Sequence, residues 1–365
     1  MERYSIPSVK LLVASIAQKV GVPANDASIL ADSLVDSDIH GVGTHGVSRL
    51  NIYIRRIQRG LINANAELTV QHGADAVLVV DAGNGLGQVQ ACKVLDMLVP
   101  LAKTHGVAAA TICNSQHFGA LSYYCNKAAQ QNMILLATTN CEPAMSPEGA
   151  CEAFFGTNPV AASFPTGKEF PIKIDLATSL IARGRIIEAR RSGTRIPEGW
   201  ALDLSGNPVT DPAEALNGTL LTMAGAKGYA LALLVEVLSG VLSGSAVGPA
   251  VGSMYKEPSV KQNVGHFFCL LNIAALMDVD HFKSRIDQMV VRIKSCRKRP
   301  GVKEILVPGE RSHRRAKENQ GLGIGLSKQT VDELETLVRE LKIDSRLEPS
   351  RAVEESPVGV GSQQV

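Results

Sequence analysis

The sequence of 365 residues is short of aromatic side chains, of net charge and of long apolar runs. Phe, Trp and Tyr make up 4% of it, and 37 Lys and Arg residues nearly balance 35 Asp and Glu residues. Nucleic-acid binding usually needs a basic surface and aromatic platforms, so we do not expect a nucleic acid as partner. The most apolar stretch, 229–242, contains Glu236 and is shorter than a membrane span. The first residues do not resemble a signal peptide, so no membrane association is expected.

Paired cysteines and metal-ligand motifs are also missing. The seven cysteines are odd in number and scattered, with no C-x-x-C pair. Neither a disulfide framework nor a zinc knuckle is expected, and a reducing compartment, the cytoplasm, fits best. Asp36, Asp38, His40 and His45 are close in sequence, but glycines interrupt their spacing and it matches no standard metal site. We therefore expect no bound metal.

Apolar residues recur at helical spacing three times in the first sixty residues. The pattern predicts helices over 9–20, over about 25–41 and over 44–60, each bounded by Pro, Gly or capping residues. These helices indicate a helical subdomain over 1–73, and we expect C-terminal helices in 310–345 to complete it.

From about residue 74, short apolar runs alternate with helical patterns. Buried strands are predicted over 76–80, 107–113, 133–138, 160–164 and 172–176, and helices over 88–104, 120–131, 227–242, 279–295 and 328–341. This alternation indicates an α/β domain over 74–309 and favours a parallel sheet, although it does not distinguish parallel from mixed pairing. The last residues, 346–365, hold little apolar material and are expected to form a disordered tail.

Two basic side chains lie near the start of the third predicted helix. His45 and Arg49 follow Thr44, the expected N-cap, and their spacing of four would place them on one helix face, away from the apolar stripe. A helix N-terminus and a guanidinium attract a carboxylate and favour a neutral imidazole. The pair therefore suits acid/base chemistry on an anionic substrate. A solvated His and Arg on a surface helix is the alternative.

A second histidine, His117, lies in the segment 114–119 between a predicted strand and a predicted helix. Strand-to-helix turns are where sites gather in layered α/β domains, because these loops project into a crevice. His117 is therefore another candidate for acid/base chemistry, and capping of the following helix is the alternative.

The glycine-rich segment 81–88 imitates a dinucleotide-binding fingerprint, since it follows a strand and opens a helix. Gln88 stands where the third glycine belongs, however, and no acidic residue follows about 20 positions later. We interpret the segment as a turn and not as a pyrophosphate-binding loop. Polar segments typical of ligand-binding loops are 156–159, 175–179 and 224–229. In the last of them, Lys227 begins an apolar helix, where the helix dipole disfavours a cation unless an anion binds.

Eight motifs in this order resemble the malate/L-lactate dehydrogenase family, which is unrelated to the Rossmann-type lactate and malate dehydrogenases. They are 45–49, 84–88, 114–119, 156–159, 175–179, 196–203, 227–229 and 307–310. The resemblance runs from about residue 5 to residue 343. It implies a three-layer α/β domain with a mixed sheet, a homodimer, and hydride transfer between NAD or NADP and a small 2-hydroxy or 2-keto acid.

The resemblance also implies roles for individual residues. His45 and His117 match acid/base histidines, and Arg49 matches a ligand of the substrate carboxylate. We expect Thr157 and Asn158 beside the substrate. The positions that match cofactor-contacting segments are Asn140, Asp175, Leu176, Ala177, Lys227, Pro308, Gly309 and Glu310. Glu148 departs from the family, in which a tryptophan is customary there, and we expect it to affect the size or charge of the acid that binds.

These roles agree with the chemistry. Reduction of a ketone places negative charge on its oxygen, so a histidine can supply the proton and take it back in the reverse direction. Two parallel hydrogen bonds from Arg49 would orient the substrate carboxylate. Two other functions stay open: a catalytically inactive nucleotide-binding or scaffolding protein of the same fold, and a metal-dependent hydrolase built on the segment 36–45.

Overall fold

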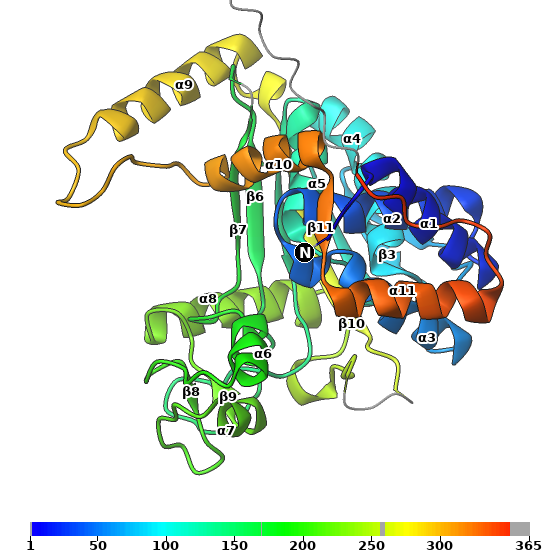
Figure 1. The fold of residues 1–365 in the computed structure, drawn as a ribbon. Coiled ribbons are helices and arrows are strands. Elements are labelled where there is room, and N and C mark those ends of the chain that lie inside the picture. The colour runs from blue at the N-terminus through cyan, green and yellow to red at the C-terminus, as the bar shows by residue number, and fades with distance from the viewer. Residues whose placement is uncertain (1, 169, 256–259, 351–365) are drawn as a thin grey trace, which may run out of the picture.

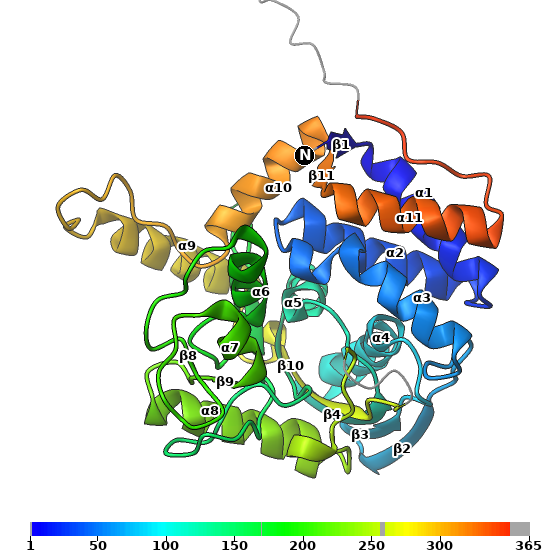
Figure 2. The ribbon, with the colours of Figure 1, turned by 60° about the horizontal axis from the view of Figure 1, so that its bottom comes forward.

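The computed structural model describes residues 2–168, 170–255 and 260–350. One of its two packed units is helical and joins both ends of the chain. It contains α1 (Ile6–Lys19), α2 (Ala24–Ile39), α3 (Leu50–Gln58) and α11 (Lys328–Leu341), with β1 (Glu2–Tyr4) paired antiparallel to β11 (Ile324–Leu326). Figure 2 shows α11 beside α1 and α3, although it comes from the other end of the sequence. One apolar core holds these elements together.

The first helix shows how the sequence specifies this unit. The Ser5 hydroxyl accepts a hydrogen bond from the backbone N–H of Ser8, and Pro7 occupies the first turn, where its missing N–H costs nothing. Gly21 follows the helix with a φ of +93°, which favours glycine. Four members of the predicted apolar stripe are buried, namely Val9, Leu12, Val13 and Ile16, and the fifth, Val20, is partly buried against the same core.

The second unit is a seven-stranded sheet in the order β2-β3-β4-β10-β5-β6-β7. Its strands are β2 (Thr69–Ala74), β3 (Val77–Asp81), β4 (Val107–Ser115), β5 (Met133–Thr139), β6 (Val160–Phe164), β7 (Ile172–Leu176) and β10 (Val264–Asn272). Within the described sheet only β3 and β4 pair in parallel, and the other neighbours are antiparallel. The α/β class and the mixed sheet implied by the resemblance are confirmed, whereas the all-parallel sheet that alternation favours is wrong.

The central strand β10, which the apolar patterns do not predict, accounts for the mixed pairing. It lies antiparallel between β4 and β5, so it separates two strands that a βαβ unit would place side by side. The strand carries His266 in the sheet core. The ring of His266 stacks on Phe118 with centroids 3.9 Å apart, and its nitrogens lie 2.8 Å from the hydroxyls of Thr139 and Ser115. Burial lowers the pKa of His266 to about 3, so the ring stays neutral.

Helices cover both faces of the sheet. α4 (Gly87–His105) and α5 (Leu121–Gln130) pack on one face. On the other face, α8 (Ala226–Glu236) continues into a π-helical turn (Val237–Val241) that packs against β10 and β4. A small lobe beyond β7 contains α6 (Arg183–Ser192), α7 (Pro212–Asn217) and the paired strands β8 (Ala201–Leu202) and β9 (Thr219–Leu220).

The C-terminal part leaves the sheet and returns to the helical unit. α9 (Val279–Ser295) projects as an arm, and α10 (Glu310–Leu322) leads back toward α2 and β11 (Figure 1). In the described chain, no helix combines the length and the apolarity needed to cross a membrane.

Two predicted boundaries shift. The sheet begins at Thr69, so the boundary expected at residue 73 falls inside β2. The expected tail over 346–365 is wrong in its first residues, because the backbone of Glu348 accepts from Ser5 N–H and Ser350 N–H donates to Arg3. Both hydrogen bonds extend the pairing of the N-terminal strand. The remainder, 351–365, lies outside the described residues.

Candidate active site

The segment that carries His45 and Arg49 is a broken turn and not the start of a helix. Two 3-10 turns, η1 (Gly43–His45) and η2 (Val47–Arg49), precede α3, which begins only at Leu50. Gly46 between the turns is extended, with φ −89° and ψ −155°. The helix predicted over 44–60 is therefore wrong at its start, and Thr44 is not the N-cap of an α-helix.

The Asp38 carboxylate, near the end of α2, explains the break. It accepts a hydrogen bond from Val47 N–H at 2.7 Å, so it fixes the second turn from outside. Burial raises the pKa of Asp38 to about 7, and the hydrogen bond from Val47 opposes that rise. A Cβ atom on Gly46 would lie 2.2 Å from Asp38 Oδ1, so the hydrogen bond between Asp38 and Val47, which we call the Asp38 clamp, requires glycine at position 46.

We expect Gly46→Ala to lower the free energy of unfolding by about 1–3 kcal/mol, because the new methyl group displaces the Asp38 carboxylate from its hydrogen bond. Gly43→Ala is the matched control, since its Cβ would lie 3.3 Å from the same oxygen and a small shift accommodates it. Chemical denaturation measures both variants. Equal stabilities for the two variants would contradict the clamp.

The two predicted histidines lie side by side. Their rings stack with centroids 5.5 Å apart and planes inclined by 21°. His45 comes from the first 3-10 turn, and His117 comes from the loop between β4 and α5. Both side chains are half-buried, so the surface reading for His45 and the capping reading for His117 do not describe their surroundings.

The glycine-rich turn 81–88 supports the His117 loop. Gln116 Nε2 donates to Asn84 Oδ1 at 2.6 Å, and a Cβ on Gly87 would lie 2.4 Å from the carbonyl oxygen of Gln116. Close backbone approach therefore explains the glycine. The segment forms a turn, as the sequence predicts, and this turn positions a candidate catalytic loop.

Tyr53 and Gln88 form a chain of hydrogen bonds that ends at His117, and the sequence motifs do not include Tyr53 or predict a role for Gln88 at this site. Tyr53 Oη lies 2.6 Å from His117 Nδ1, and Gln88 Nε2 donates to Tyr53 Oη at 2.9 Å. Burial raises the pKa of Tyr53, so the phenol keeps its proton. Its position four residues after Arg49, on the same side of α3, is the signal that could have found it.

Arg49 completes the group that we call the histidine cluster, defined as His45, Arg49, Tyr53 and His117. Its Nε donates to the Thr44 carbonyl at 2.5 Å, and a terminal nitrogen donates to the Tyr255 hydroxyl. The guanidinium also lies 5.5 Å from the centroid of the Tyr255 ring. A guanidinium has five N–H donors, so partners in the described chain leave some for a ligand.

Electrostatics make both imidazoles neutral. Enclosure by protein and the charge of Arg49 lower the pKa of His45 to about 4. The pKa of His117 is lowered well below its usual value by burial, with smaller contributions from His45 and Arg49. Two neutral rings beside a cation can accept a proton from a substrate whose carboxylate the arginine binds.

Backbone hydrogen bonds link three of the segments expected to contact the cofactor to β7 and to the loop that follows it. Lys173 N–H donates to the Pro308 carbonyl at 3.1 Å, so Pro308 and Gly309 lie against the strand that carries Asp175. Next to them, the backbone of Thr178 accepts from Met223 N–H at 2.9 Å. That contact joins 175–177 to the loop before Lys227.

Individual side chains in these segments differ in access. Asp175 and Leu176 at the end of β7 and Lys227 at the start of α8 are exposed, and Ala177 is half-buried. Asp175 Oδ2 accepts a hydrogen bond from Ser122 N–H at 2.8 Å, at the start of α5. Loss of water around the carboxyl raises its pKa, and the hydrogen bond from Ser122 opposes that rise.

Glu310 faces inward and binds cations of its own chain. Its Oε1 lies 2.7 Å from Lys294 Nζ and 2.6 Å from an Arg314 nitrogen. Burial alone would raise the pKa of Glu310, but these hydrogen bonds lower it. The side chain therefore anchors α10 against α9.

Two predicted ligand residues, Asn140 and Asn158, have buried side chains that form hydrogen bonds within the protein. Asn140 donates to the Ala246 carbonyl at 2.8 Å, and Asn158 donates to Glu236 at 2.7 Å. Glu236 also accepts from Gly248 N–H, so the carboxylate ties these loops together under the small lobe. Both amides are fully buried, and the Oδ1 of Asn158 has no hydrogen-bond partner among the described residues.

Thr157 and Glu148 lie farther along the same loops. Thr157 is half-buried, its hydroxyl lies 3.6 Å from Cys141 Sγ, and its carbonyl accepts from Thr178 N–H. Glu148 is exposed, and its carboxylate lies 3.8 Å from the Cβ position of Gly225, beside the start of α8.

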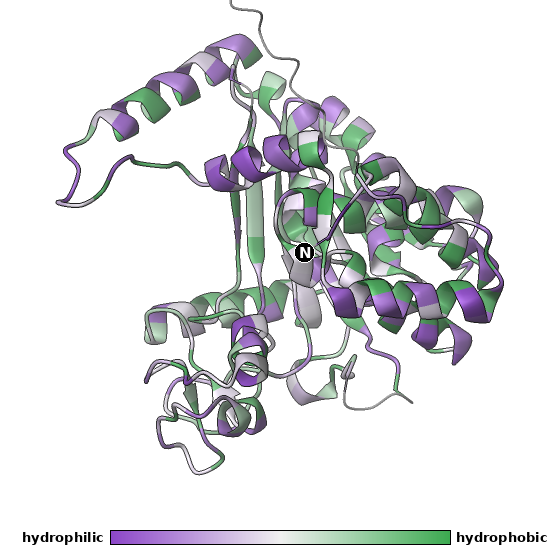
Figure 3. Ribbon diagram, viewed as in Figure 1, coloured by the Kyte–Doolittle hydropathy of each residue, from purple (hydrophilic) through white to green (hydrophobic). Residues whose placement is uncertain are grey.

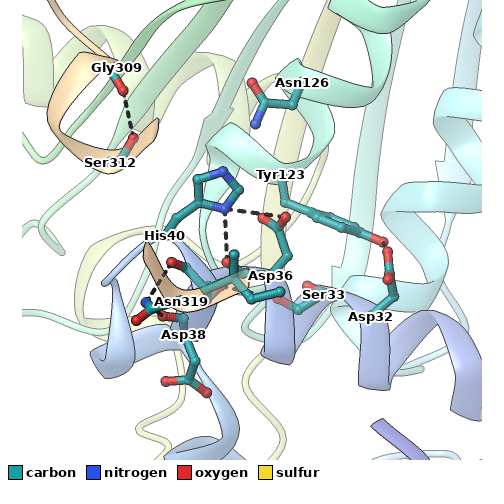
Figure 4. A network of polar contacts seen from close by, with 12 residues as sticks. Asp32, Ser33, Asp36, Asp38, His40, Tyr123, Asn126, Gly309, Ser312 and Asn319 are labelled. Atoms are coloured by element: carbon teal, nitrogen blue, oxygen red, sulfur yellow. Dashed lines mark hydrogen bonds and ion pairs between the residues drawn. The ribbon is translucent and has the colours of Figure 1, made fainter. Parts of the chain in front are cut away.

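The acidic end of α2 does not form the metal cluster that could be drawn from the sequence. His40 Nδ1 lies 3.3 Å from Asp36 Oδ1, whereas the Asp38 side chain points away from both, as Figure 4 shows. Among the described residues, no group of three or more His, Cys, Asp or Glu side chains could hold a metal ion. The hydrolase alternative therefore has no ligand set in this part of the chain.

Known proteins resemble this chain over most of its length. A family model described as malate/L-lactate dehydrogenase matches residues 4–335. The L-sulfolactate dehydrogenase of Methanocaldococcus jannaschii is 38% identical over 335 residues, 92% of this chain and 96% of that protein. The solved structure of a sulfolactate dehydrogenase from that organism has a TM-score of 0.87 and 37% identity, covering 93% of this chain and 97% of that one.

The names of two further relatives include a nicotinamide cofactor. A (2R)-3-sulfolactate dehydrogenase (NADP(+)) of Chromohalobacter salexigens is 33% identical over 332 residues, 90% of this chain and 96% of that protein. A ureidoglycolate dehydrogenase (NAD(+)) of Escherichia coli K12 is 31% identical over 308 residues, 84% of this chain and 88% of that protein.

The protein is an NAD(P)-dependent oxidoreductase of 2-hydroxy acids. This class is defined by the mixed sheet with helices on both faces, by the paired neutral histidines beside an arginine, and by these relatives. The chain belongs to the malate/L-lactate dehydrogenase family, as its motifs predict. The comparisons lend no support to a catalytically inactive protein of the same fold.

Proposed function

We propose that the histidine cluster is the place where hydride passes between a nicotinamide and C2 of a small 2-hydroxy or 2-keto acid. The observation that carries this proposal is the stacking of two neutral imidazoles, 5.5 Å apart, beside a guanidinium with unused donors. In the proposal, Arg49 binds the substrate carboxylate and His117 exchanges the proton of the 2-hydroxyl group. Thr157 lines the side toward the small lobe.

The predicted cofactor segments fit a dinucleotide. Lys227 is exposed in the first turn of α8, whose N-cap, Gly225, supplies no side-chain hydrogen bond. A lysine and open N–H groups at a helix N-terminus are a favourable place for a phosphate. Asp175, Leu176, Ala177, Pro308 and Gly309 would line the remainder, with Asn140 and Glu310 holding the backbone around them. Bound there, NAD or NADP supplies the hydride acceptor or donor.

His117 is suited to take a proton in the oxidation direction. In the proposal, His117 carries its ring hydrogen on Nδ1, which donates to Tyr53 Oη 2.6 Å away, so that Nε2 of the ring keeps its lone pair. That nitrogen accepts the hydroxyl proton as C2 loses hydride. In the reverse direction, the protonated ring donates the same proton to the developing alkoxide.

Arg49 and His45 set the charge around that proton. A substrate carboxylate bound to Arg49 offsets the positive charge that lowers the pKa of both histidines. Binding therefore strengthens the base at the moment it is needed. Two parallel hydrogen bonds from the guanidinium also fix which face of C2 meets the nicotinamide.

We expect the two directions to differ in pH dependence. The oxidation rate, as kcat/KM, requires a neutral imidazole, and the lowered pKa of His117 keeps it neutral from pH 6.5 upward. This rate should stay level between pH 6.5 and 8.5. Reduction requires the protonated ring, so its kcat/KM should fall by about tenfold per pH unit over the same range.

Asp38→Asn is the control for these profiles, since Asp38 titrates at about 7. The amide oxygen can still accept from Val47 N–H but does not titrate. Opposite slopes that persist in this variant assign them to the histidines. Equal slopes in both directions would contradict a histidine as proton donor and acceptor.

The function is tested directly by the absorbance of the reduced cofactor. NADH and NADPH are mixed with the enzyme and pyruvate, oxaloacetate, 2-oxoglutarate, sulfopyruvate or a cyclic imino acid. We expect oxidation of one or both cofactors by at least one of the oxo acids. Absence of turnover with every combination would contradict the proposal.

We further propose that the enzyme is a cytoplasmic homodimer. Large apolar side chains are exposed along α8 and the π turn, a mostly apolar stretch in Figure 3; they are Leu231, Leu233, Leu234, Val237, Val241 and Leu242. Contiguous exposed apolar surface of this kind favours association with a second copy. All seven cysteines are free, which suits a reducing compartment. Light scattering of the purified enzyme measures the mass of the assembly.

A further inference from the structure

We propose that Arg183 binds a second anionic group of the substrate, so that the enzyme prefers acids that carry two negative charges. This inference rests on the function proposed above and adds to it a substrate class and the residue that selects it. Arg183 is the first residue of α6 in the small lobe. Sequence patterns assigned it no role.

One line of contacts runs from the histidine cluster to Arg183. Arg49 donates to the Tyr255 hydroxyl, and the preceding residue, Met254, donates its backbone N–H to Glu142 Oε2 at 2.7 Å. Arg183 in turn lies 3.4 Å from Glu142 Oε1. Tyr255 feels the charges of Arg49, Glu142 and Arg183 together, so these groups share one neighbourhood.

A second contact reaches the same place from the other side. A Cβ atom built on Gly184, the next residue of α6, would lie 3.1 Å from Thr44 Cγ2. Thr44 directly precedes His45, and its hydroxyl lies 3.1 Å from His45 Nδ1. The start of α6 therefore packs against the loop that carries one histidine of the cluster.

Among the four groups linked by these contacts, positive charge exceeds negative charge, and one further carboxylate, Glu152, lines the small-lobe cavity that Arg183 borders. Arg183 pairs with Glu142 directly, Arg56 lies within its electrostatic range, and Arg49 is connected through Tyr255. Three guanidiniums and one carboxylate leave two positive charges uncompensated among these four groups. A substrate with one carboxylate would balance only one of them, whereas a dianion would balance both.

Arg56 gives independent evidence that this charge is unmet. The residue is 2% exposed, and its Nε and one terminal nitrogen have no hydrogen-bond partner in the part of the chain that the structure describes. Its other terminal nitrogen donates to the Val260 carbonyl at 2.9 Å. A side chain so deeply buried cannot reach a substrate, so we assign to Arg56 a contribution to the positive potential and not a direct contact.

Arg183 is placed to meet an anion. Its pair with Glu142 is long, at 3.4 Å, and 27% of its side chain is exposed. The first turn of α6 contains no acidic residue, and its N-cap, Ala182, offers no side-chain hydrogen bond. A helix N-terminus disfavours a cation unless an anion is bound, and here the guanidinium and the open N–H groups could bind the same group.

The test compares acids that differ only in the distal group. Initial rates with NADH and NADPH are measured for pyruvate, which has one carboxylate, and for oxaloacetate and sulfopyruvate, which add a carboxylate or a sulfonate. We expect wild-type kcat/KM to be at least about tenfold higher for one or both of the dianions. The two dianions show which distal group the site accepts.

Substitution then assigns the preference to a residue. We expect Arg183→Gln to lower kcat/KM for the preferred dianion by about 10- to 100-fold, mainly through KM, and to change that for pyruvate less than about twofold. Arg183→Lys keeps the charge and should recover part of the loss. Arg185→Gln removes an exposed arginine of the same helix and should leave all rates unchanged.

The outcomes separate this inference from the function on which it rests. A wild-type enzyme that favours pyruvate, or an equal loss on all three acids in Arg183→Gln, would overturn the role of Arg183. If Arg183→Gln does not fold, the wild-type preference and the Arg183→Lys rates decide. An enzyme that oxidises neither cofactor with any acid would instead overturn the proposed function.

Discussion

Replacement of His117 by alanine is expected to lower kcat by about 100- to 10,000-fold, the range that general acid/base catalysis supplies. His117 is the ring whose Nδ1 is held by Tyr53 at 2.6 Å, which leaves Nε2 for the substrate. Nicotinamide binding should change less than about twofold, because none of the predicted cofactor segments includes His117. Steady-state rates and the fluorescence of bound NADH measure the two quantities separately.

His45→Ala tests the second ring in the same way, and we expect its turnover to collapse while NADH binding persists. His40→Ala is the control, since His40 lies outside the cluster and its Nδ1 is 2.9 Å from the Asp36 carbonyl. This variant should keep wild-type kcat. A His117→Ala enzyme that retains more than a tenth of kcat would rule out His117 as the proton-transfer group.

Arg49→Gln should lower kcat/KM by about 100- to 1,000-fold for every acid tested. A charge-assisted, two-point contact with the carboxylate is lost, and C2 is no longer held against the nicotinamide. Both kcat and KM should therefore worsen. Arg49→Lys restores the charge without the planar pair of donors, so it should recover only part of the rate.

Arg55→Gln is the matched control for Arg49, because Arg55 lies on α3 as well but pairs with Glu340 at the surface, 2.6 Å away. We expect its rates to stay within about twofold of wild type, since exposed ion pairs contribute little. A loss in Arg49→Gln no larger than in Arg55→Gln would contradict the carboxylate-binding role.

The sequence could predict the elements whose signal is local. Helical spacing sufficed for α1 and α9, and apolar runs of the correct length sufficed for β6 and β7. The center of the sheet could not be predicted in this way, because β10 owes its place to pairing with strands more than a hundred residues away. Its central His266 is satisfied only by partners that the fold brings to it.

The candidate site shows the same division between local and distant causes. Motif order identified His45, Arg49 and His117, and the structure brings all three together. The helical spacing of apolar residues wrongly predicts that the third helix begins at Thr44. The Asp38 carboxylate from α2 binds Val47 N–H and breaks the helix at Gly46.

Residues that act through tertiary contacts had no sequence signal strong enough to assign a role. Tyr53 follows Arg49 by four residues, but that spacing alone does not show that its hydroxyl lies 2.6 Å from His117 Nδ1. Tyr255 and Arg183 lie in loops and at a helix start whose place beside Arg49 depends on the whole fold. Asn158 lies in a segment that the sequence predicts to be a ligand-binding loop, and its side-chain amide donates a hydrogen bond to Glu236 inside the protein.

The central claim is that one substrate contacts Arg49 and His117 at the same time, and a crystal structure of the ternary complex with NADH and oxamate tests it most directly. We predict that the oxamate carboxylate binds the Arg49 guanidinium and that its carbonyl oxygen lies within hydrogen-bond distance of His117 Nε2. The nicotinamide C4 should face the carbonyl carbon. Oxamate bound elsewhere, with the two side chains contacting only solvent, would contradict the account.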